Sequence, residues 1–102
     1  MIVEHAEFTI TPGREAEFEQ AFVRGHRFIA QSPGYHWGRL IRQIENPGTY
    51  LLLVGWETLE AHTVEFRGSE LFRQWRGEVG EFFAAPAAVT HFRGEVEPGE
   101  LG

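Results

Sequence analysis

The segment from Thr49 to Trp56 is apolar on both of the faces that an extended strand presents. One face carries Tyr50, Leu52, Val54 and Trp56, and the other carries Leu51 and Leu53. Such a strand suits the interior of a sheet that is covered on both sides. The run is too short to cross a bilayer. The segment therefore predicts a central strand of a folded domain.

Three further segments have the pattern of strands. Residues 2–10 alternate, with Glu4, Ala6 and Phe8 on one face. Residues 35–44 precede the central strand, and the turn Glu45-Asn46-Pro47-Gly48 between them predicts a hairpin because Pro-Gly supplies the turn dihedrals. Residues 88–93 predict a last short strand.

Two main helices and one short helix connect these strands. Residues 14–30 have an amphipathic pattern, with Thr11 as the expected cap. Thr58 is the expected cap of a short helix over 59–66, and Ser69 that of a helix to about residue 83. The order predicts an α+β, ferredoxin-like βαββαβ domain with a four-stranded antiparallel sheet. We expect one domain over 1–93 and a flexible tail over 94–102.

In this architecture both helices cover the same sheet face, so the other face is open. The central strand is apolar on both faces, so the open face is apolar whichever set of its side chains lies there. A large exposed apolar face is an aggregation hazard for a monomer. The pattern therefore predicts a homodimer in which a second copy covers the sheet about a two-fold axis.

The composition excludes several kinds of chemistry. The chain has no Cys, Lys or Asp; its nine basic residues are all Arg and its fifteen acidic residues are all Glu. Iron–sulfur clusters, thiolate zinc sites, disulfides and Schiff bases are excluded. The net charge of −6 without a basic cluster argues against a nucleic-acid partner. The N-terminus lacks a signal-peptide pattern, so we expect a cytoplasmic protein with no membrane contact.

The aromatic content points to a cavity or an interface. Nine Phe, three Trp and two Tyr are many for the thin core of a domain of 102 residues. We expect some of these rings to line a cavity between sheet and helices that takes a small molecule. The alternative is that the rings only fill the core and the dimer interface.

Three residues are candidates for proton chemistry. His62 lies four residues before Phe66, so helical spacing puts its imidazole beside a ring, where it would be a neutral base or simply a packing residue. The Trp56 N–H can donate to a substrate oxygen, or be tied to a carbonyl in the core. Glu4 lies among apolar neighbours, which would raise its pKa if it faces the cavity.

Metal and anion sites have weaker signals. His5 and His91 on neighbouring strands, with Glu4 or Glu7, would suggest a metal, but the spacing is not that of a ligand set and we expect none. Arg39 and Arg42 have opposite parity on their strand, so only one of them can point inward, where it could bind an anionic substrate.

Four segments have distinctive sequences: Thr-Pro-Gly at 11–13, Ser-Pro-Gly-Tyr at 32–35, Leu-Leu-Leu-Val-Gly-Trp-Glu-Thr-Leu-Glu-Ala-His-Thr at 51–63, and Phe-Arg-Gly-Ser-Glu-Leu-Phe-Arg-Gln-Trp at 66–75. With the order of elements, they resemble the antibiotic biosynthesis monooxygenase domain over about residues 1–93. The resemblance implies a homodimeric α/β barrel of two ferredoxin-like units. Characterised members of this family include cofactor-free oxygenases that convert polycyclic phenols to quinones, quinol oxidases and haem-degrading enzymes.

The resemblance also assigns family positions to this chain. Of the residues used by the quinone-forming branch, the Trp is kept as Trp56, the Asn position falls on Leu52 and the Tyr position on His62. The Asn, Trp and His of the haem-degrading branch fall on Ala6, Phe66 and Arg76, so haem degradation is disfavoured.

The resemblance therefore implies a cofactor-independent monooxygenase that oxidises a phenol or quinol with dioxygen. His62 would be the base and the Trp56 N–H the donor to the substrate anion. The expected binding residues are Tyr50, Leu52, Phe66, Phe72 and Glu4. The alternative is a non-catalytic ligand-binding dimer, which the loss of the Asn favours.

Overall fold

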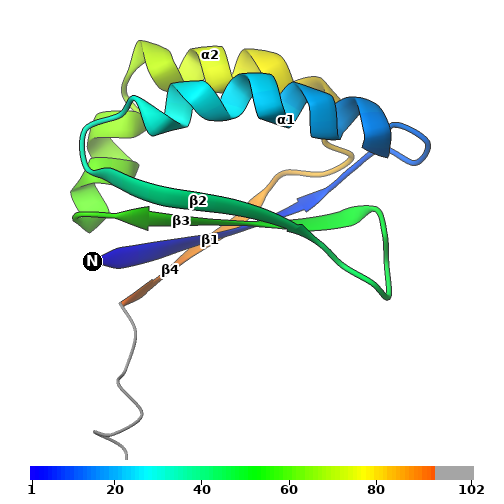
Figure 1. The fold of residues 1–102 in the computed structure, drawn as a ribbon, viewed down its shortest axis with the longest axis horizontal. Coiled ribbons are helices and arrows are strands. Elements are labelled where there is room, and N and C mark those ends of the chain that lie inside the picture. Colours follow the sequence, from blue (N-terminus) through cyan, green and yellow to red (C-terminus); the bar gives the residue numbers. More distant parts are fainter. Residues whose placement is uncertain (94–102) are drawn as a thin grey trace, which may run out of the picture.

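The four strands form one antiparallel sheet with the order β2-β3-β1-β4. The computed structural model describes residues 1–93, and the predicted tail over 94–102 lies outside them. Both main helices lie on one face of the sheet (Figure 1). The elements are β1 (Ile2–Thr9), α1 (Glu15–Ala30), β2 (Tyr35–Arg42), β3 (Thr49–Trp56), the π-helix η1 (Ala61–Phe66), α2 (Glu70–Val79), the 3₁₀ turn η2 (Gly80–Phe82) and β4 (Ala88–Arg93). The predicted ferredoxin-like arrangement is confirmed.

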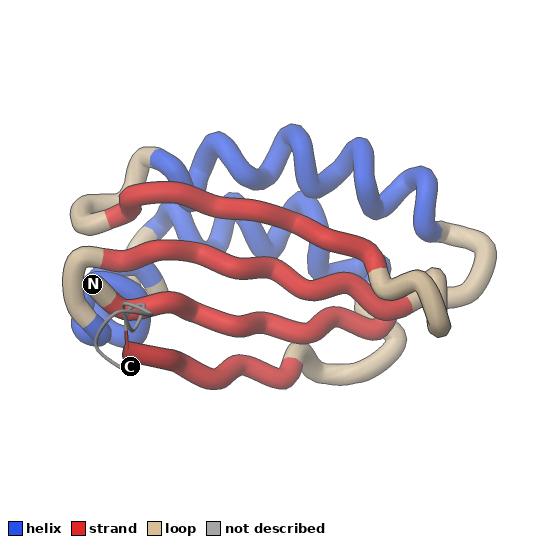
Figure 2. The backbone as a smooth tube through the Cα atoms, turned by 60° about the horizontal axis from the view of Figure 1, so that its bottom comes forward, coloured by secondary structure: helices blue, strands red, loops and turns tan. Residues whose placement is uncertain are grey.

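The core lies between the sheet and the helices. β3 is an inner strand that pairs with both β1 and β2, as its two apolar faces predicted. Ala6, Phe8 and Leu52 point toward the helices and are buried. Leu51 and Leu53 point the other way and are half-buried. Figure 2 shows this second face in front, with the helices behind the four strands.

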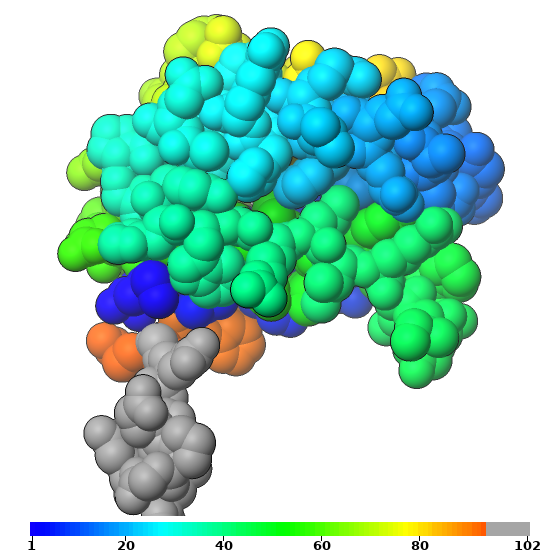
Figure 3. Space-filling model, viewed as in Figure 1, coloured from blue at the N-terminus to red at the C-terminus, as the bar shows by residue number. Residues whose placement is uncertain are grey.

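The turn between β2 and β3 projects beyond the sheet (Figures 1 and 3). The Thr49 N–H donates to the Asn46 carbonyl at 2.9 Å and closes the predicted turn. Ile44 is 90% exposed there, and β2 ends at Arg42, two residues earlier than we expected. No helix within residues 1–93 is long and apolar enough to span a membrane.

The first helix begins differently from the prediction. The Thr11 hydroxyl does not cap α1; it donates to the Phe82 carbonyl at 3.2 Å and ties the loop before α1 to the end of η2. The physical reason is the extra turn made by Pro12 and Gly13, where Gly13 has φ +88°, because this turn separates Thr11 from the first helical N–H groups.

The predicted caps of the two later helices are present. Ser69 Oγ accepts a hydrogen bond from the Phe72 N–H at 3.3 Å, and Thr58 Oγ1 accepts one from the Ala61 N–H at 3.1 Å. The short helix that follows Thr58 is a π-helix, in which the Arg67 N–H donates to the His62 carbonyl at 3.1 Å. Such wide turns are rare and often occur at functional sites.

The turn before β2 supports this π-helix. Gly34 has φ +89°, and a methyl group added there would lie 2.7 Å from Ala61 Cβ. The Gly34 carbonyl also accepts a hydrogen bond from the Glu57 N–H at 2.7 Å. Only glycine fits both the dihedral and the close approach. The turn therefore sets the position of the segment that carries His62.

We expect Gly34→Ala to destabilise the protein more than Gly13→Ala. Both glycines have a positive φ, but nothing lies within 4 Å of a methyl group added at Gly13. Gly13→Ala should cost about 1 kcal/mol for the dihedral alone. Gly34→Ala should cost about 2 kcal/mol more, because it also overpacks against Ala61. Urea denaturation measures both values, and equal losses would show that the contact with Ala61 is not constraining.

Candidate active site

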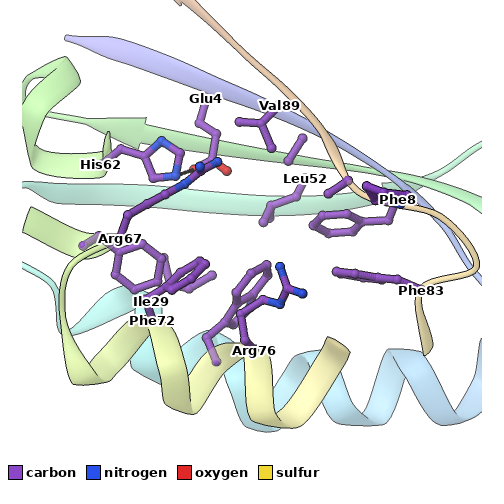
Figure 4. A pocket seen from close by; sticks show the side chains of 15 residues that line it. Glu4, Phe8, Ile29, Leu52, His62, Arg67, Phe72, Arg76, Phe83 and Val89 are labelled. Atoms are coloured by element: carbon purple, nitrogen blue, oxygen red, sulfur yellow. Dashed lines mark ion pairs between the residues drawn. The ribbon is translucent and has the colours of Figure 1, made fainter. Parts of the chain in front are cut away.

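A cavity of about 320 Å³ lies between the helix-facing side of the sheet and α2 (Figure 4). Its size is that of a small-ligand pocket. Most of its wall is apolar, and four charged or titratable side chains interrupt the apolar surface. The lining residues are Glu4, Ala6, Phe8, Ile29, Leu52, His62, Phe66, Arg67, Phe72, Trp75, Arg76, Phe83, Pro86, Ala87 and Val89.

Glu4 is a buried carboxylate in the wall of this cavity. It lies on β1 among apolar neighbours and is only 7% exposed. The Trp56 N–H donates to Glu4 Oε1 at 2.9 Å. Burial raises the pKa of Glu4, while the Trp56 hydrogen bond and the nearby charge of Arg67 act in the opposite direction. The pKa of Glu4 is therefore raised, but its anion has a fixed donor.

His62 lies between Glu4 and a second histidine. Its Nε2 is 3.3 Å from Glu4 Oε1, and its Nδ1 is 2.7 Å from His91 Nε2. Burial lowers the pKa of His62 to about 4, and the charges of Arg67 and His91 act in the same direction. His62 is therefore a neutral imidazole at neutral pH.

The three side chains form a path for a proton. A neutral His62 whose Nε2 proton faces the Glu4 carboxylate has a bare Nδ1, which accepts the Nε2 proton of His91. His91 lies on the edge strand β4, directly opposite Glu4 in the register, and is only partly buried. Burial and the charge of Arg67 lower the pKa of His91 as well. The path therefore runs from the cavity wall toward the surface.

The Trp56 N–H neither binds a core carbonyl nor faces a substrate, which were the two roles that the sequence suggested for it. Its ring is fully buried and its N–H is bound to a carboxylate, neither to a carbonyl nor open to a ligand. The ring stacks on His62 with centroids 5.3 Å apart and planes inclined by 17°. Trp56 thus contacts both Glu4 and His62 from behind the cavity wall.

The structure brings five of the predicted site residues to the cavity: Glu4, Leu52, His62, Phe66 and Phe72. Tyr50 does not line it. The Tyr50 ring packs in the core against Phe18, and its hydroxyl donates to the Glu19 carboxylate, because β3 carries residue 50 to the far end of the sheet. Burial and the Glu19 contact raise the pKa of that hydroxyl.

Of the residues considered for a metal or anion site, Glu4 lines the cavity, whereas His5, Glu7, Arg39 and Arg42 do not. His5 lies on the open sheet face beside Phe92, opposite to the face of His91, so the two histidines cannot share an ion. Within residues 1–93, no group of three or more His or Glu side chains is arranged to hold a metal. Arg42 points to the helix side but binds Glu19 at 3.2 Å, and Arg39 is exposed and directly opposite Leu53 in the strand register.

Sequence reasoning missed two arginines and the pairing of His62 with His91. Glu4 and His91 are opposite each other in the pairing of β1 with β4, so a strand register could have placed them together. No strand register or motif in the sequence places Arg67 and Arg76 near each other. A helix break at Gly68 separates them, and only the packing of α2 on the sheet brings both to one cavity.

The comparisons with known proteins agree with this fold. The family model for antibiotic biosynthesis monooxygenases matches residues 1–78, and the chain belongs to that family. The uncharacterized protein YczJ of Bacillus subtilis is 40% identical over 93 residues, which cover 91% of this chain and 98% of YczJ.

Solved structures resemble the chain as well. A Bordetella bronchiseptica protein whose name assigns it to the same family has a TM-score of 0.90 and 41% identity, over 93% of this chain and 97% of that one. SnoaB of Streptomyces nogalater, a cofactor-independent oxygenase, has a TM-score of 0.80 and 21% identity over 95% of each chain. At that identity the likeness to SnoaB concerns the fold.

We expect Trp56→Phe to cost more stability than Trp75→Phe. Both changes remove the same atoms from a buried ring, but within residues 1–93 the Trp75 N–H has no hydrogen-bond partner. Only Trp56→Phe strips a donor from a buried carboxylate, which should cost about 2 kcal/mol more. Urea denaturation at neutral pH measures the difference. Equal losses would mean that the bond to Glu4 adds nothing to stability.

Proposed function

We propose that the protein is a cofactor-independent monooxygenase that oxidises a phenol or quinol-type aromatic molecule with dioxygen. The observation that carries this proposal is that Glu4 and His62 are buried side by side in the wall of a ring-lined cavity, with the half-buried His91 behind them. A phenol must lose its proton before it can reduce dioxygen, and the Glu4 carboxylate of this chain can accept that proton.

Glu4 is the group that we propose as the first acceptor, in place of His62. Both nitrogens of His62 already face partners, Glu4 and His91. In Glu4, by contrast, Oε1 receives the contacts from Trp56 and His62, while Oε2 has no hydrogen-bond partner within residues 1–93. Burial raises the pKa of Glu4, and a carboxylate with a raised pKa is a stronger base. Trp56 is then a positioning residue that holds the carboxylate.

The proposed reaction balances with dioxygen as the sole oxidant. Glu4 takes the phenolic proton, and the phenolate passes one electron to dioxygen. The resulting phenoxyl radical and superoxide combine to form a carbon–oxygen bond at a ring carbon. The peroxide takes up a proton, and loss of the ring proton with cleavage of the O–O bond releases water. The ring becomes a quinone that holds one oxygen atom, and water holds the other.

The walls of the cavity favour this chemistry. Phe66 and Phe72 pack edge to face with centroids 5.5 Å apart, and Phe83 stacks on Phe8 at 4.8 Å. Such rings offer stacking partners to a planar substrate. An apolar wall also keeps water away from the radical pair and the peroxide. Family membership and the described activity of SnoaB support the same reaction class.

A second candidate function is ligand binding without catalysis. The resemblance puts the Asn of the quinone-forming branch at Leu52, which lines the cavity and offers no hydrogen-bond donor to a substrate anion. The two functions separate experimentally, because a binding protein would take up phenols without consuming oxygen.

We expect Glu4→Gln to abolish oxygen uptake with a phenol substrate. A panel of naphthols, anthrones and hydroquinones, followed with an oxygen electrode, identifies the substrate. Glu4→Gln keeps the shape but cannot take a proton, so kcat should fall by about a hundredfold or more. The matched control is Glu45→Gln, because Glu45 is exposed in the turn between β2 and β3 and does not line the cavity. Its rate should equal that of the wild type.

The pH profile adds an independent measurement. The wild-type rate should rise with pH as Glu4 ionises, because only the carboxylate accepts a proton. A Glu4→Gln variant that turns over at the wild-type rate would refute the assignment of Glu4. Binding of phenols without any oxygen uptake by the wild type would favour the second candidate.

We also propose that the protein is a homodimer whose interface is the open sheet face. Among residues 1–93 nothing packs on this face (Figure 2). Ile41 and Phe92 are 50% and 55% exposed, and Leu51 and Leu53 lie between them on the inner strand. A second copy is self-complementary to such a face and removes the apolar surface from water.

We expect Leu51→Glu to convert the dimer into a monomer. The change puts a carboxylate on the apolar face between Ile41 and Glu7, where it has no cationic partner and its burial is costly. Val23→Glu is the control, because Val23 is exposed on the outer side of α1. Light scattering after size-exclusion chromatography measures the mass. A wild-type protein that elutes as a monomer would contradict the proposal.

A further inference from the structure

The charges around the cavity do not match those of the rest of the protein. The chain has a net charge of −6, yet the cavity is lined by two arginines and one glutamate. Arg67 and Arg76 form no ion pair within residues 1–93, whereas Arg14, Arg24, Arg42 and Arg73 each bind a glutamate. The cavity is therefore a positive site on an acidic protein, and such a site attracts anions.

The two guanidinium groups reach the cavity from the side of α2. Figure 4 shows Arg76 rising from α2 toward the sheet, near Phe83, while Arg67 extends toward Glu4 and His62. The Arg76 guanidinium carbon lies 5.8 Å from the centroid of the Phe83 ring. Both arginines are exposed at the rim of the cavity. A ligand on the aromatic wall can therefore meet both charges.

We infer that the substrate is an aromatic carboxylate, whose acid group binds Arg76 while its phenol lies between Glu4 and Arg67. This inference rests on the proposed function. A guanidinium has a planar fork of donors that fits both oxygens of a carboxylate, and it tolerates an aromatic surface on its face. A neutral phenol would use the stacking rings but leave the fork of Arg76 without a partner.

Arg67 has a separate task in this arrangement. It is close enough to Glu4, His62 and His91 for its charge to act on all three. The same charge stabilises a phenolate that forms beside Glu4. Arg67 thus supplies the anion stabilisation that Leu52 cannot offer. Arg76 binds the substrate, and Arg67 favours loss of its proton.

Binding of two matched probes tests the inference without any turnover. The probes are 6-hydroxy-2-naphthoate and its neutral analogue 6-hydroxy-2-naphthamide, titrated anaerobically by calorimetry. The wild type should bind the acid about tenfold to a hundredfold more tightly than the amide, as a charged hydrogen-bonded pair predicts. Arg76→Gln should remove this preference and leave the affinity for the amide nearly unchanged. Equal affinities of the wild type for acid and amide would overturn the inference.

Arg73→Gln is the matched control, because Arg73 lies on the same helix and is exposed like Arg76, but it is bound to Glu70 outside the cavity. It should keep the wild-type preference. Equal losses in the Arg73→Gln and Arg76→Gln variants would also overturn the inference, because the effect would then be one of overall charge.

Arg67→Gln tests the second task. It should raise the pKa of the bound naphthol, which the ultraviolet absorption of the naphtholate reports. An unchanged pKa would remove Arg67 from the proposal.

These results are independent of catalysis. A preference for the acid without oxygen uptake would keep the anion site and reject the oxygenase. Oxygen uptake with the amide, together with equal binding of acid and amide, would keep the oxygenase and reject the anion site.

Discussion

The burial of the Glu4 carboxylate is the constraint around which the site is built. A buried carboxylate is costly unless donors meet it, and Trp56 and His62 both approach the same oxygen, at 2.9 and 3.3 Å. This arrangement requires three elements to meet: β1 carries Glu4, the end of β3 carries Trp56, and the π-helix carries His62. The order of the sheet brings β1 and β3 together, and the stacking of Trp56 on His62 holds the third element in place.

The same contacts give the cavity an uneven wall. On the sheet side, the titratable groups lie next to one another and lead outward through His91. On the α2 side, rings alternate with the two arginines (Figure 4). A planar molecule between these walls has a proton acceptor on one side and positive charge on the other. That combination is what deprotonation of a phenol needs, because the acceptor removes the proton and the charge stabilises the anion.

Much of the fold could be read from the sequence, because the pattern of each segment had only one consistent interpretation. The limits of β3 and β4 were predicted correctly, since the turn Pro47-Gly48 precedes β3 and Pro86 lies two residues before β4. The cap of α1 was predicted wrongly, because the Thr11 hydroxyl donates to a carbonyl 71 residues away. Tyr50 and Trp56 share a face of β3, but one points to Glu19 at one end of the sheet and the other to Glu4 at the opposite end. Whether a residue has an odd or even position along a strand specifies the sheet face on which its side chain lies. It does not specify which residue of another element that side chain contacts.

The sequence by itself determined the alternation of elements, the strand face that Glu4 shares with Ala6 and Phe8, and the absence of thiol and lysine chemistry, since these follow from residue type and spacing. Only the tertiary structure decided which groups meet. It joined His62 to His91, bound the Trp56 N–H to Glu4, and brought Arg67 and Arg76 to one cavity. The physical reason is the distance along the chain over which each interaction acts. Strand and helix patterns are local, whereas hydrogen bonds and the charges around a cavity depend on the packing of segments that are distant in the chain.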